Sequence, residues 1–72
     1  MKAIVKAVAK NGNTPCNFPW INGVRTDIIL WNEKPTLENF ETGVREVKSM
    51  INKDANKFGM ALKDLEVTIQ FV

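Results

Sequence analysis

The chain has 72 residues, a net charge of +2 and a hydrophobic content of 44%, the size and composition of one small globular domain over residues 1–72. It contains no histidine and a single cysteine, Cys16, which excludes histidine-ligated metals, internal disulfides and serine–histidine or cysteine–histidine catalytic pairs. No stretch is apolar for the roughly 20 residues that span a bilayer, and the first residues lack a signal-peptide core, so we expect a cytoplasmic protein without a membrane partner.

The first predicted element is a strand over residues 2–10, whose side chains alternate between two faces. One face is small and apolar and suits close packing of a helix; it holds Ala3, Val5, Ala7 and Ala9. The other face carries a lysine row interleaved with larger apolar residues: Lys2, Ile4, Lys6, Val8 and Lys10. Lysines protect a strand at the edge of a sheet from unwanted pairing, and such a row can also follow a phosphate backbone. We favour the protective role because the net charge is small.

Residues 11–20 are predicted to be an irregular loop. Asn11-Gly12 and Asn22-Gly23 are turn signals, and Pro15 and Pro19 each remove an amide donor that a central strand needs. A second strand is predicted from about residue 24 to residue 31. Two aromatic residues of the loop, Phe18 and Trp20, either fill the end of a thin core or belong to a contact surface.

A long helix and a last strand complete the pattern. Thr36 is a plausible helix cap, apolar residues recur at steps of three and four from Leu37 through Val44 and Ile51 to Phe58, and Gly59 ends the series. Residues 65–71 alternate between apolar and polar side chains, as in a half-buried strand. The sequence therefore predicts a two-layer α+β domain of order β-β-α-β, with one helix on a small mixed sheet whose second and third strands run parallel through a right-handed crossover.

One helix can cover only one face of this sheet. The other face would leave four large apolar residues among charged ones, and we predict that they form an oligomer interface: Ile4, Val8, Ile29 and Trp31. In the alternative arrangement, the 11–20 loop folds over these residues as a lid.

We expect a non-enzymatic binding or inhibitory protein that occupies the surface of a protein partner, as a dimer or higher oligomer, with no catalytic residue, metal or cofactor. The predicted contact residues are Phe18, Trp20, Arg25 and Trp31, because aromatic and arginine side chains dominate binding hot spots. The first alternative is single-stranded nucleic-acid binding by aromatic residues and the lysine row, Lys2, Lys6 and Lys10. The second is sequestration of a small anionic ligand, such as a nucleotide, by the predicted loop between the first two strands, which is rich in asparagine.

Overall fold

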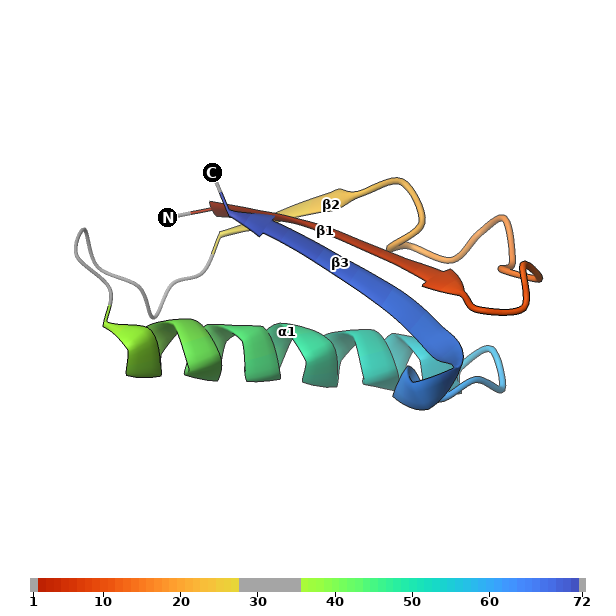
Figure 1. Ribbon diagram of the computed structural model, residues 1–72. Helices are drawn as coiled ribbons and strands as arrows, with labels where there is room; N and C mark the ends of the chain where they lie inside the picture. Colours follow the sequence, from red (N-terminus) through yellow and green to blue (C-terminus); the bar gives the residue numbers. More distant parts are fainter. Residues whose placement is uncertain (1, 28–35, 72) are drawn as a thin grey trace.

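The computed structural model describes residues 2–27 and 36–71 (Figure 1). The helices and strands follow the chain in the order β1 (Lys2–Ala9), β2 (Val24–Asp27), α1 (Leu37–Asn56), a short 3-10 helix η1 (Leu62–Asp64) and β3 (Leu65–Phe71). The predicted α+β class is confirmed. The predicted second strand extended to residue 31, and its part beyond Asp27 lies outside the described residues.

The sheet has three strands in the order β2-β1-β3, and β1 pairs antiparallel with each neighbour. The predicted mixed sheet is therefore wrong for the described strands. The segment that contains α1 connects the two outer strands, which point the same way but are separated by β1 (Figure 1). The prediction that the lysine row protects an edge strand from unwanted pairing is wrong as well, because β1 is the central strand and is paired on both sides.

The helix α1 begins where the sequence predicts. Thr36 Oγ1 accepts a hydrogen bond from the Asn39 backbone N–H at 3.2 Å, and Asn39 Oδ1 accepts one from the Thr36 N–H at 3.3 Å. This reciprocal capping box satisfies amides that a helix start leaves free. After the helix, Gly59 adopts a φ of +74° and the Met60 N–H donates to the Ala55 carbonyl at 3.0 Å, so the chain turns back toward β3.

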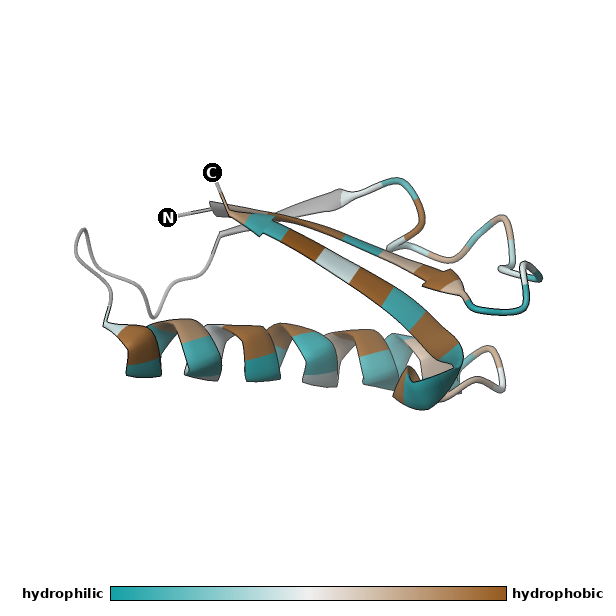
Figure 2. Cartoon of the chain, viewed as in Figure 1, coloured by the Kyte–Doolittle hydropathy of each residue, from teal (hydrophilic) through white to brown (hydrophobic). Residues whose placement is uncertain are grey.

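The core lies between α1 and the alanine-rich face of β1. Six residues of these two elements are at most 2% exposed: Ala3, Val5, Ala7, Val47, Ile51 and Ala55. The small apolar face of β1 and the helix share this core, as the sequence predicts. Along β3 the hydrophobic and hydrophilic residues alternate, and the register places Val67 beside Ala7 and Ile69 beside Val5 (Figure 2).

The loop between β1 and β2 contributes to the same core. Phe18 is 1% exposed and Trp20 is 6% exposed, and the Phe18 ring meets the Phe58 ring edge-on with centroids 5.5 Å apart. Trp20 Nε1 donates a hydrogen bond of 2.7 Å to Asp54 Oδ2 on α1. The Ala7 N–H donates to the Trp20 carbonyl at 3.2 Å, so the loop already pairs with β1 before β2 begins.

Candidate functional site

Two of the four predicted contact residues are buried in the core. Phe18 and Trp20 are buried against α1, so the prediction that they touch a partner is corrected: a side chain in the core cannot contact another molecule. Arg25 lies in β2 opposite Ile4 of β1. Trp31 lies outside the described residues. The sequence left open whether the two loop aromatics fill the core or belong to a contact surface. The structure supports the core.

On the face of the sheet away from α1, the described apolar side chains lie beside polar ones. Ile4 and Val8 are half-buried, and the exposed Lys6 lies between them. Their partners across the β1–β3 pair are exposed polar residues, with Ile4 beside Gln70 and Val8 beside Glu66. Ile29 and Trp31, the other members of the predicted oligomer interface, lie outside the described residues, so that interface stays a prediction. In the alternative arrangement, the 11–20 loop would cover this face as a lid. That arrangement is wrong for Phe18 and Trp20, because both pack on the face of the sheet toward α1.

The lysine row runs along β1 and into the residue that follows it. Lys10 follows the end of β1, where its N–H donates to the Asp64 carbonyl at 2.9 Å, while Lys2 and Lys6 belong to the strand. Single-stranded nucleic-acid binding also needs accessible aromatic rings on which bases stack. Phe18 and Trp20 are buried and cannot provide them.

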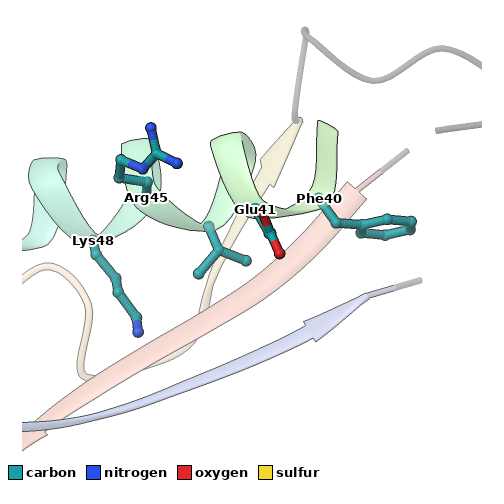
Figure 3. Close-up of a pocket in the computed structure, with 5 residues that line it drawn as sticks. Phe40, Glu41, Arg45 and Lys48 are labelled. Carbon is teal, nitrogen blue, oxygen red and sulfur yellow. The ribbon is translucent and has the colours of Figure 1, made fainter. Parts of the chain in front are cut away.

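An apolar hollow lies along the first half of α1. The hollow has a volume of about 370 Å³. Five side chains from neighbouring turns of the helix line it, and Figure 3 draws them as sticks: Phe40, Glu41, Val44, Arg45 and Lys48. We call these five residues the α1 groove. Phe40 and Val44 are only half-buried, although the periodicity of the sequence predicts that both belong to the core, and Leu37 is 74% exposed.

The α1 groove extends to the open edge of the sheet. The Phe40 ring packs edge-on against the Phe71 ring of β3 with centroids 5.4 Å apart, and Phe71 remains 39% exposed. Val67 and Ile69, on the same face of β3, are half-buried. In the described part of the chain, β3 pairs with β1 along one edge and has no strand along the other. An unpaired strand edge offers backbone N–H and C=O groups to a further strand.

A second hollow of about 390 Å³ lies where the β1–β2 loop meets η1. It is lined by Ala9, Lys10, Asn11, Asn13, Pro15, Phe58, Gly59, Met60, Lys63 and Asp64. Two lysines and one carboxylate therefore line this hollow, and Asp64 Oδ2 accepts a hydrogen bond from the Ala61 N–H at 3.0 Å. Part of the asparagine-rich segment, which the sequence singles out for anion binding, is thus placed in a concave site.

The described residues contain no cluster of three His, Cys, Asp or Glu side chains that could hold a metal ion, and Cys16 is exposed. No helix in these residues is long and apolar enough to cross a membrane. Comparison of the chain with protein-family models, curated proteins and solved structures gave no match. The features of the described residues that bear on function are the two hollows and the unpaired edge of β3.

Proposed function

We propose that this chain is a small non-enzymatic binding protein that acts by occupying the surface of another protein chain. The observation that supports this function is the apolar α1 groove beside the open edge of β3. A partner segment can add to such an edge as a further strand, with backbone hydrogen bonds providing affinity and side-chain hollows providing specificity.

The groove combines an apolar floor with a charged rim. Val44 and the Phe40 ring supply the floor, while Glu41, Arg45 and Lys48 carry both signs of charge around it. Desolvated apolar surface inside a polar rim is the usual arrangement of a protein interface. Because the rim contains carboxylate and basic groups together, it suits a protein partner better than the uniformly anionic backbone of a nucleic acid.

The test is a selection of phage-displayed random peptides on the chain, immobilised at a density low enough that copies do not meet. We expect enriched peptides that add as apolar strands, and we expect Val44→Glu to weaken their binding at least about tenfold, because it places a charge on the floor of the groove. Ser49→Glu makes the same substitution at an exposed position of α1 outside the groove and should leave the affinity unchanged. Failure to enrich any peptide, or equal binding to both variants, would contradict the proposal.

The second hollow supports a second candidate function, sequestration of a small anionic ligand. Lys10 and Lys63 would neutralise the anion and the Phe58 ring would contact an apolar part of the ligand. A thermal-shift panel of nucleotides tests this function: a ligand at 100 times its Kd stabilises the protein by about 2.7 kcal/mol, or roughly 10 to 20 °C in Tm for a domain of this size. Lys10→Ala or Lys63→Ala should abolish the shift, whereas Lys53→Ala on α1 should not. A panel without any shift excludes nucleotides as the ligand.

A further inference from the structure

The following inference depends on the proposed function and names its partner. We infer that the chain occupying the edge of β3 and the α1 groove is a second copy of this protein, which pairs its own β3 antiparallel to the first about a two-fold axis beside Thr68. The two sheets then join into one sheet of six strands. This arrangement covers, in each copy, the edge of β3 that no described strand pairs with, and such an edge is otherwise prone to nonspecific pairing.

The sequence of β3 is complementary to itself in this register. Thr68 is the central residue of the seven in β3, so antiparallel pairing about it uses the full strand. Glu66 then lies opposite Gln70 of the second copy, and Thr68 lies opposite Thr68, so no like charges meet. On the face toward α1, Val67 lies opposite Ile69 of the second copy, which extends the apolar layer across the junction.

The position of α1 places complementary charges near the same axis. Phe71 packs against Phe40 at one end of β3, and the Leu62 N–H donates to Asn52 Oδ1 at 2.9 Å just before the other end. The helix and the strand therefore run in opposite directions. Thr68 lies between these two contacts along β3, as Val44 does along α1.

A two-fold axis at this position exchanges the two ends of the α1 groove. Glu41 and Lys48 are seven residues apart, about two helical turns, and therefore lie on one side of α1 at opposite ends of the groove. Glu41 of one copy then comes toward Lys48 of the second copy, and the contact is repeated symmetrically. A strand from an unrelated protein would not bring charges complementary to Glu41 and Lys48 to these positions by symmetry. A chain of 72 residues also buries a smaller fraction of its surface on folding than a larger domain does, so association adds core that the monomer lacks.

Disulfide trapping tests both the pairing and its register. The variants are Cys16→Ser/Thr68→Cys and, as a matched control, Cys16→Ser/Glu66→Cys, because both new thiols replace exposed residues on one face of β3 and the native thiol is removed. In the inferred register the two residues 68 lie about 4.5–5.5 Å apart between Cα atoms, within the range for a disulfide. The two residues 66 lie about 13 Å apart, which is too far.

We expect the residue-68 variant to form a covalent dimer under mild oxidation at least ten times faster than the residue-66 variant, with circular dichroism showing that both are folded. Light scattering on the native sequence should give twice the monomer mass of 8.1 kDa at micromolar concentrations. A monomer at all concentrations, or equal cross-linking of the two variants, overturns the inference. If self-pairing fails while selected peptides still bind and Val44→Glu weakens them, the partner is a different protein. If the peptides fail as well, the proposed function is also wrong.

Discussion

Phe18→Ala is expected to destabilise the domain by about 3–5 kcal/mol, the usual cost of deleting a buried aromatic ring. The Phe18 side chain is 1% exposed and packs edge-on against Phe58. Domains are stable by about 0.05–0.15 kcal/mol per residue, so a loss of this size removes a large part of the stability of a 72-residue chain. Urea unfolding followed by far-ultraviolet circular dichroism measures the change.

Leu37→Ala is the control for this experiment, because Leu37 is 74% exposed and its truncation should change the free energy of unfolding by less than about 0.5 kcal/mol. A partner-binding role for Phe18 predicts the reverse pattern, in which the alanine variant folds normally and loses only affinity. A free energy of unfolding for Phe18→Ala within 1 kcal/mol of the native value would therefore show that the ring does not belong to the core.

The elements with a clear period were predictable from the sequence. The alternation of Ala3, Val5 and Ala7 with lysines and larger residues identified the face of β1 that packs on α1, and all three are fully buried. Thr36 identified the start of α1, and the alternation of residues 65–71 identified β3. These signals are local, because a side chain on a strand or helix points in a direction that its neighbours already determine.

The loop aromatics could not be placed in this way. Residues 11–20 have turn residues and no period, so the sequence gives no direction for Phe18 or Trp20. The contacts that decide their positions come from Phe58 and from Asp54, which is 34 residues from Trp20 along the chain. The strand order has the same cause: a helix between two strands implies that they point the same way, but it leaves open whether β1 lies between them.

The α1 groove shows that the apolar period of a helix does not by itself decide which of its apolar residues are buried. The buried residues of α1 are spaced by four, Gly43, Val47, Ile51 and Ala55. A step of four residues rotates about 400° around a helix with 3.6 residues per turn, so this line of contact shifts by about 40° at each step. Val44 and Leu37 fit the average apolar face equally well in the sequence, yet they lie at its flank. Their exposure creates the groove that carries the proposed function.

Ile51→Ala tests the position of this line of contact at its centre. Ile51 is completely buried between α1 and β1, and its truncation should cost about 2–5 kcal/mol through lost burial and the cavity left behind. The adjacent Met50 is 44% exposed, so Met50→Ala deletes a side chain of similar size from the same helical turn for less than about 1 kcal/mol.

The conservative Ile51→Val variant should recover most of the loss, because it removes one methylene group and costs about 0.5–1.5 kcal/mol. Urea titrations of the three variants at one protein concentration measure these differences, with the concentration held constant because self-association adds to the apparent stability. Equal destabilisation by Ile51→Ala and Met50→Ala would mean that α1 is rotated about its axis. Met50 would then face the sheet, and the groove residues, most of which lie on the other side of Ile51 around the helix, would turn away from the sheet and from the edge of β3.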